Sequence, residues 1–286
     1  MRLKSFRQHV SERAAILIAH NAIFEGGKVF HDETKRINKD QVDATISDIE
    51  KNLFPTLGLK LDNNVIRLGS SGHSETSGDI DFGIIGMDLS KLHDLIKSKF
   101  SNKTNFIKGL EVLSIEWPIE GDEENGLVQL DFIPVYDRDW TEFIYKYPTE
   151  SKYKSAHRNW LFMAVLSSIR NNVEKDETTD EPLSYDGYML NLNKGLFSMK
   201  KDYQGKTKIL KHGQIVDDKL ITTNPKEFVE FVFGKGYKPK DVRTFEECWH
   251  IINNDNFKWI DNIDDIKKNL KKFLSRVELP IPTELD

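Results

Sequence analysis

The chain has 286 residues, of which 38% are hydrophobic and 30% charged, so it can bury a core as one large domain or two modest ones. Its 41 basic and 46 acidic side chains give a formal net charge of −5, so the protein surface is not basic overall. Any contact with nucleic acid must therefore come from a local basic patch. The single cysteine, Cys248, excludes an internal disulfide. The sequence shows neither a signal-peptide pattern nor an apolar run of the ~20 residues that a membrane span needs. We therefore expect a cytoplasmic protein.

The first predicted elements are two helices. Apolar residues at helical spacing predict a helix over 4–23, which Gly26 and Gly27 end, and a second over 39–54, which Pro55 and Gly58 end. The second helix is expected to bury one face, which carries Val42, Ile46, Ile49 and Leu53.

Four strands and one helix follow in mixed order. The helix begins after Asp88, whose side chain can cap free backbone N–H groups, and the last two strands flank an acidic turn at 121–126 as a β-hairpin. This order predicts a mixed sheet within an α+β fold. The predicted strands are 65–68, 79–85, 111–117 and 127–133, and the predicted helix is 89–100.

A second module is expected to begin at Asp139. Helices are predicted over 139–146 and 155–173, and the acidic, polar run 174–182 indicates a loop. Residues 185–221 are expected to form β-structure with turns at Gly187, Gly195, Gly205 and Gly213. The last helices are predicted over 225–233, 244–253 and 264–277.

Two aspartates open the strand at 79–85. Asp79 and Asp81 are spaced i, i+2, so they share one face of the strand, while Ile80, Phe82 and Ile84 share the other. Like charges this close are unfavourable unless a cation lies between them. The pair therefore indicates a divalent-metal site beside a polar turn.

Asp131 supplies a third carboxylate in the strongly apolar run 127–135, where an unpaired charge would be costly. It shares its strand face with Gln129 and Ile133. If this strand lies beside strand 79–85, the three carboxylates converge. That is the ligand set for two Mg²⁺ ions roughly 3.5–4 Å apart, which clamp the attacking and leaving oxygens of a phosphoryl transfer.

These motifs resemble the polymerase-β-like nucleotidyltransferase superfamily. The resemblance covers about residues 60–135, and Glu75 to Asp81 is especially similar to the loop and strand of the DNA-polymerase branch. It implies a mixed-sheet nucleotidyltransferase core with flanking helices at 1–138, and a smaller C-terminal α/β module at 139–286 that binds substrate or supports the core. The matching residues are Gly69-Ser70, Ser77-Gly78-Asp79-Ile80-Asp81 and Asp131.

The resemblance also implies the metal ligands and the reaction. Asp79 and Asp81 would bind both ions, and Asp131 would bind the ion that activates the attacking hydroxyl. The implied cofactor is Mg²⁺, as two ions, with Mn²⁺ as a substitute. The implied reaction transfers a nucleoside monophosphate from a nucleoside triphosphate to an acceptor hydroxyl and releases pyrophosphate.

The triphosphate contacts are implied in the same way. Gly69 and Ser70 would hold the β- and γ-phosphates, with Ser77 as a further contact. Eight residues separate Ser70 from Asp79, which is at the short end of the family's loop lengths. His73 lies where the family often has a basic residue and is the candidate donor there.

Other cations would have to meet the remaining phosphate charge. Lys154 and Arg158 are at i, i+4 near a predicted helix start, where N–H groups favour anions; the alternative is an ordinary solvated surface. A second patch, Lys194 to Lys211, interleaves lysines with Phe197 and Tyr203, as a single-strand binding surface would, or is a hairpin kept soluble by its lysines. A loop with Lys28, His31 and Arg36 could approach the site only if the fold brings it back.

The leading interpretation is a Mg²⁺-dependent nucleotidyltransferase whose acceptor is an RNA or DNA 3′ end, with a protein hydroxyl or a small molecule left open. One alternative is a non-catalytic scaffold that binds a nucleotide or nucleic acid. Another is a regulator or toxin that nucleotidylates a partner protein. The oligomeric state stays open.

Overall fold

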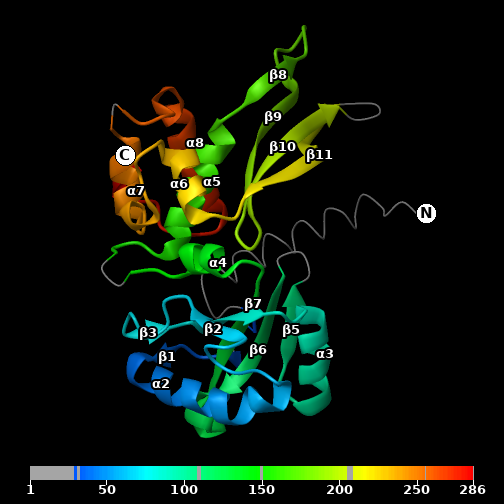
Figure 1. The fold of residues 1–286 in the computed structure, drawn as a ribbon, viewed down its shortest axis with the longest axis vertical. Helices are drawn as coiled ribbons and strands as arrows, with labels where there is room; N and C mark the ends of the chain where they lie inside the picture. The colour runs from blue at the N-terminus through cyan, green and yellow to red at the C-terminus, as the bar shows by residue number, and fades with distance from the viewer. Residues whose placement is uncertain are drawn as a thin grey trace, which may run out of the picture. The chain divides into compact units, whose positions relative to one another are not determined.

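The computed structural model describes residues 29–30, 33–107, 111–148, 151–204, 209–254 and 256–285, and the side chains of 209–213 are not described (Figure 1). The helix predicted over 4–23, the turn at Gly26 and Gly27, and the candidate contacts Lys28 and His31 lie outside these residues. So does the turn predicted at Gly205.

The described residues form an α+β structure with seven α-helices and three sheets. The chain divides into two compact units, of which the first holds residues up to Tyr136 together with Tyr145–Thr149. The second holds Asp137–Ile144 and the chain from Glu150 onward. The boundary expected at 138/139 thus lies close to the division, but the short segment at 145–149 belongs to the first unit.

A mixed five-stranded sheet forms the centre of the first unit, in the order β2-β4-β7-β6-β5 (Figure 1). β4 and β7 run parallel, and every other neighbouring pair is antiparallel. The predicted strands at 65–68 and 79–85 have the observed bounds, whereas β5 was not predicted. The strands are β2 Val65–Leu68, β4 Asp79–Ile85, β5 Thr104–Ile107, β6 Val112–Pro118 and β7 Leu127–Val135.

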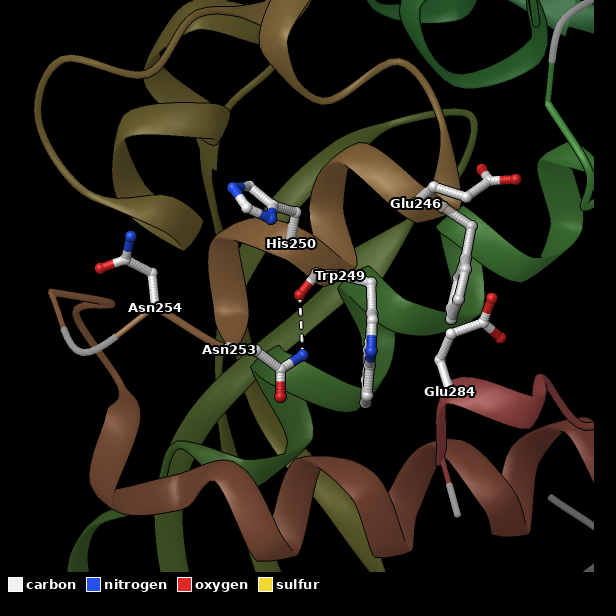
Figure 2. Close-up of a pocket in the computed structure, with 7 residues that line it drawn as sticks. Glu246, Trp249, His250, Asn253, Asn254 and Glu284 are labelled. Atoms are coloured by element: carbon white, nitrogen blue, oxygen red, sulfur yellow. Dashed lines mark hydrogen bonds between the residues drawn. The ribbon is translucent and has the colours of Figure 1, made fainter.

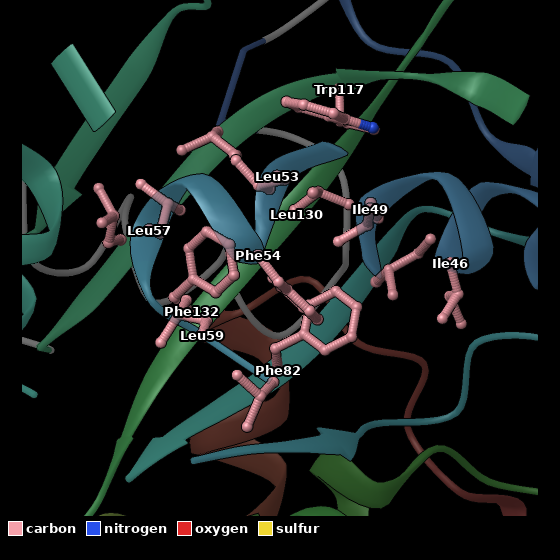
Figure 3. Close-up of a cluster of buried hydrophobic side chains, with 14 of the residues drawn as sticks. Ile46, Ile49, Leu53, Phe54, Leu57, Leu59, Phe82, Trp117, Leu130 and Phe132 are labelled. Carbon is pink, nitrogen blue, oxygen red and sulfur yellow. The ribbon is translucent and has the colours of Figure 1, made fainter. Parts of the chain in front are cut away.

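One face of this sheet is covered by two helical segments. The first segment is α2 (Lys39–Asp48), which continues as a π-helical turn, Ile49–Leu53, and a 3-10 turn, Pro55–Leu57. The second is α3 (Leu89–Lys99). It begins at the predicted cap, where the Asp88 side chain accepts hydrogen bonds from the N–H groups of Ser90 and Lys91. Figure 3 shows the resulting core, in which side chains of the first segment pack on the strands. The rings of Phe54 and Phe82 meet edge to face at 5.2 Å, and Phe82 stacks with Phe132 at 6.1 Å.

The opposite face of the sheet is divided between apolar and acidic ends. Its apolar cluster is formed by Ile66, Leu68, Val112 and Ile133. Gly83 lies there because a Cβ at this position would be 2.6 Å from Val135 Cγ2 and 2.7 Å from Ile66 Cγ1. Two residues earlier on β4, the same face carries acidic side chains, because alternate residues of a strand point the same way.

A two-stranded sheet, β1 (Ile37–Asn38) with β3 (Thr76–Ser77), joins the start of α2 to the loop before β4. The backbone N–H of Lys39 also donates to the carbonyl of Glu75 at 3.0 Å. The polar loop between β2 and β4 is therefore anchored to the chain that precedes α2.

The second unit combines helices with a four-stranded antiparallel sheet in the order β11-β10-β9-β8 (Figure 1). Its core is aromatic: Phe228 meets Trp140 at 5.3 Å and Phe162 at 5.2 Å, both edge to face. The strands are β8 Asn171–Lys175, β9 Pro182–Asn191, β10 Gly195–Gln204 and β11 Ile209–Thr222. The helices are α4 Arg138–Tyr145, α5 Ser155–Ser168, α6 Pro225–Phe233, α7 Phe245–Ile252 and α8 Ile263–Arg276.

Three predictions for this unit are wrong. The helix expected over 155–173 ends at Ser168, because Ile169 is extended and the chain continues into β8. Gly187 and Gly213 lie inside β9 and β11 and form no turn. At Gly187 the small residue allows a close approach instead, since a Cβ there would lie 3.1 Å from the Tyr185 ring and 3.4 Å from the carbonyl oxygen of Ile169.

The longest described α-helices, α5 and α8, have 14 residues each, and no described helix combines the length and apolar character required to cross a membrane.

Candidate functional site

The three predicted carboxylates meet on the acidic end of the first unit's sheet. β4 and β7 lie parallel in a register that sets Asp81 opposite Asp131 and Asp79 opposite Gln129. One possible ligand atom from each of Asp79, Asp81 and Asp131 lies within 4.8 Å of the other two. The predicted convergence of the carboxylates is therefore confirmed.

Asp131 is fully buried and held by two neighbours on the same sheet face. Ser114 Oγ on β6 donates to its Oδ1 at 2.6 Å, and Gln129 Nε2 donates to Oδ1 at 3.0 Å and Oδ2 at 2.9 Å. Burial raises the pKa of Asp131 to about 6, against the lowering effect of these hydrogen bonds. The side chain is thus fixed in place and can change its charge near neutral pH.

The ionised form of Asp81 is opposed both by burial and by like charge. Burial raises its pKa well above the ordinary value, and the charges of Asp79 and Asp131 raise it further. Burial also raises the pKa of the Tyr145 hydroxyl, and the nearby Asp81 charge adds to that rise. The ring of Tyr145 packs on the apolar cluster of this face. A cation among the carboxylates would relieve the repulsion that these shifts record.

The Gly-Ser turn lies directly against this cluster. Gly69 has φ +68°, and a Cβ at this position would overlap Oδ2 of Asp81 and lie 3.0 Å from its Cγ. The N–H of His73 donates to the carbonyl of Ser70 at 3.0 Å, which closes the turn, and Ser70 is exposed. Gly69 also forms a parallel β-bridge with Lys146. Only glycine combines this backbone conformation with room for the carboxylate.

The loop that follows the turn is held at several points. Arg67 Nη2 donates to the carbonyl of Ser71 at 2.8 Å, and the N–H of Gly72 donates to Ser77 Oγ at 3.2 Å. Arg36 binds Thr76 through its side-chain hydroxyl and its carbonyl, each at 2.9 Å. Arg36, one of the loop residues considered as a phosphate contact, is thus engaged in fixing the loop. The buried hydroxyl of Ser77 closes the loop, and its nucleotide contact stays a prediction, as does that of His73.

The structure places Lys154 and Arg158 differently from the prediction, which set both on one helix face. α5 begins at Ser155, so Lys154 is the exposed residue before the helix, whereas Arg158 is 1% exposed inside it. The Arg158 guanidinium donates to the carbonyls of Phe143 and Ile144 at 2.8 Å and of Arg243 at 3.0 Å. Arg158 therefore stabilises the interior of the second unit, and its burial argues against the predicted nucleotide contact. The same prediction for Lys154 stays open.

Several residues around the carboxylates were not identified as site residues from the sequence. Gln129 and Ser114 had a weak signal, since each is a polar residue in an apolar strand run on the side facing Asp131. Tyr145 and Lys146 had none, because they follow the strands by several residues and reach the turn only through the fold. Val29, whose N–H donates to Gln129 Oε1 at 3.0 Å, is of the same kind.

A pocket of about 390 Å³ lies in the second unit (Figure 2). The rings of Phe245 and Trp249 stack at 5.8 Å. Asn253 donates to the carbonyl of Trp249, as the dashed line in Figure 2 marks. Its two carboxylates already have partners: Glu246 accepts from Ser151 Oγ and the N–H of Lys152, and Glu284 accepts from the hydroxyl of Tyr153. Both carboxylates are thus held by neighbours within the second unit. Its lining residues are Phe245, Glu246, Trp249, His250, Asn253, Asn254 and Glu284.

No family model matches the chain, and no curated protein matches it.

Proposed function

We propose that the first unit is the catalytic core of a metal-dependent nucleotidyltransferase, which transfers a nucleoside monophosphate from a nucleoside triphosphate to an acceptor hydroxyl and releases pyrophosphate. The observation that supports it is the convergence of Asp79, Asp81 and Asp131 beside a Gly-Ser turn whose glycine abuts one of the carboxylates. Hard oxygen ligands next to a turn that can approach phosphate are what nucleotidyl transfer requires.

The donor set fits a divalent cation. It offers carboxylate oxygens alone, which favour Mg²⁺ or Mn²⁺ over metals that prefer nitrogen or sulfur ligands. Burial raises the pKa of Asp81 and of Asp131, and like charge raises that of Asp81 further, so the ionised carboxylates are costly unless a cation offsets their charge. When bound, such ions would neutralise phosphate charge and lower the pKa of the attacking hydroxyl.

The protein's own groups then have distinct tasks. Asp131, fixed by Ser114 and Gln129, would orient the acceptor hydroxyl toward the α-phosphate. The exposed Ser70 and its turn would contact the departing pyrophosphate. Lys146, which is exposed and bridges to Gly69 through its backbone, is the cation that we add to the phosphate-binding set.

The chemical class of the acceptor has to be determined by experiment. The lysine-rich patch from Lys194 to Lys211 in the second unit is our basis for expecting an RNA or DNA 3′ end. Acidic residues lie beside its lysines on the neighbouring strands: Lys200 on β10 pairs with Asp186 on β9 and with Asp217 on β11. These carboxylates offset part of the positive charge, so the patch alone does not select nucleic acid. Nucleic-acid ends are compared first because of the remaining lysines, with protein hydroxyls and small molecules as the alternatives. A non-catalytic scaffold is the alternative from another class.

The deciding experiment measures Mg²⁺-dependent pyrophosphate release from each nucleoside triphosphate, with and without RNA or DNA oligonucleotides. Wild type is compared with Asp81→Asn and with Asp94→Asn, which makes the same change at an exposed position of α3. Release that Asp81→Asn loses and Asp94→Asn keeps supports the transferase, and the stimulating oligonucleotide identifies the acceptor class. If no release occurs, incorporation of labelled nucleotide into the proteins and small molecules of a cell extract is measured, and its absence from both rejects the transferase in favour of the scaffold.

A further inference from the structure

Asp131 lies at the end of a hydrogen-bond chain that starts on the backbone before β1. The N–H of Val29 donates to Gln129 Oε1 at 3.0 Å. Because a backbone N–H can only donate, the oxygen of the Gln129 amide must face Val29, and its nitrogen must face Asp131. Gln129 is fully buried. Its orientation is therefore set by the backbone rather than by solvent.

The donors on Asp131 are distributed unequally over its two oxygens. Oδ1 accepts from both Ser114 Oγ, at 2.6 Å, and Gln129 Nε2, at 3.0 Å, whereas Oδ2 accepts from Gln129 Nε2 alone, at 2.9 Å. An ionised carboxylate has about four lone-pair sites, two for each oxygen. Oδ1 has thus filled its sites, and Oδ2 retains one.

We propose that Gln129 and Ser114 are positioning residues that present Oδ2 of Asp131 alone to the divalent cation, so that Asp131 is a monodentate ligand. This inference rests on the proposed metal centre and assigns two residues on neighbouring strands to it. The N–H of Val29 completes the arrangement by keeping the Gln129 amide from turning over. Partners of this kind hold the ligand in place, and their loss typically reduces metal affinity about 10- to 100-fold.

A purely structural role makes a different prediction. If the hydrogen bonds only satisfied a buried carboxylate, their removal would destabilise the fold but leave the affinity of the folded protein for metal unchanged. Metal affinity, measured separately from folding stability, therefore separates the two roles.

The experiment measures Mg²⁺ and Mn²⁺ dissociation constants of the full chain by calorimetry, and the geometry of bound Mn²⁺ by electron paramagnetic resonance, without nucleotide. Ser114→Ala and Gln129→Leu remove the donors, and Ser114→Thr restores the hydroxyl. Ser168→Ala is the matched control, because Ser168 is also buried but donates to the carbonyl of Val165 in the second unit. Thermal melts without metal establish that each variant is folded.

We expect Ser114→Ala and Gln129→Leu to raise both dissociation constants about tenfold or more, and Ser114→Thr and Ser168→Ala to leave them within about twofold of wild type. Val29→Pro, which removes the N–H that Val29→Ala keeps, should weaken binding in the same direction. Wild-type affinity in folded Ser114→Ala overturns the proposal, and this variant decides the matter if Gln129→Leu does not fold.

The same measurements distinguish failure of this inference from failure of the proposed function. If wild type binds no divalent cation, the metal centre itself is wrong and both fall. If the affinities change as expected but neither pyrophosphate release nor incorporation of labelled nucleotide into an acceptor is found, the positioning role stands and the transferase is rejected.

Discussion

Gly69 and Asp81 are in direct contact, so closely that any side chain at position 69 would overlap the Asp81 carboxylate. The contact joins the turn after β2 to the carboxylate cluster on β4, which is its antiparallel neighbour. The turn and the cluster therefore cannot change independently.

Gly69→Ala should displace Asp81 and weaken Mg²⁺ binding, and the left-handed backbone at this position should cost a further ~1–2 kcal/mol of folding stability. Gly58→Ala is the control, since Gly58 also has φ +68° but has no atom within 4 Å of a Cβ. The two variants should lose similar stability from the backbone, whereas only Gly69→Ala should lose the Mg²⁺-induced rise in melting temperature. Equal Mg²⁺ responses would refute the contact.

Asp81→Asn should stabilise the metal-free protein, because it removes one charge from a cluster in which burial and like charge both oppose ionisation. The same change removes a ligand, so the stabilisation that Mg²⁺ confers on wild type by binding the folded state should largely disappear. Thermal melts at several Mg²⁺ concentrations test both effects. If wild type and Asp81→Asn respond identically, the carboxylate cluster does not bind Mg²⁺.

In the metal-free protein, the contribution of Asp131 to folding stability should fall as the pH rises from about 4 to 7. The pKa of Asp131 is raised from 3.8 to about 6 by burial, so folding favours its protonated form. The stabilising contribution of Asp131 to the free energy of unfolding is fully present below its pKa in the unfolded chain. It is lost as the pH rises through its pKa in the folded protein, and the change is on the order of 2 kcal/mol. Chemical denaturation across this range, compared with Asp131→Asn, isolates the contribution, and a wild-type advantage that grows with pH contradicts it.

Arg158→Lys should destabilise the second unit by about 2–4 kcal/mol, because lysine cannot reproduce the planar donor set that binds three backbone carbonyls and would leave some of them unpaired. Arg138→Lys is the control, since Arg138 is exposed and pairs with Glu142. Under conditions where both variants are folded, the KM for nucleotide should match wild type. A raised KM with unchanged stability would restore the nucleotide contact that the burial of Arg158 argues against.

Glu116→Gln should raise folding stability at neutral pH by up to about 1 kcal/mol. Glu116 is 4% exposed, its Oε1 has no hydrogen-bond partner among the described residues, and burial raises its pKa despite the opposing charge of Lys103. The neutral amide lacks the buried charge, so the gain should be present at pH 7 and vanish near pH 4. Melts of both proteins at the two pH values measure it, and a gain independent of pH would point to packing instead.

The sequence by itself determined four of the five strands of the first unit's sheet and the faces of β4 and β7, but not β5. The alternation of Asp79 and Asp81 with Ile80 and Phe82 assigned the two sides of β4 because strand side chains alternate whatever the strand packs against. The same rule assigned Asp131 and Phe132 to opposite faces of β7. The Asp88 cap and the hairpin around 121–126 were also predictable, because they depend on neighbours within a few residues.

Only the tertiary structure decided the register that pairs Asp81 with Asp131, the contact of Gly69 with Asp81, and the chain from Val29 through Gln129. It also decided that Arg158 is interior and that the chain after Ser168 is extended, since Ile169 and Val173 fit a helix or a strand equally well by spacing. These features depend on which distant segments share a sheet or a core. Local residue patterns establish which way a side chain faces, but the neighbour that it meets is set by packing over the whole unit.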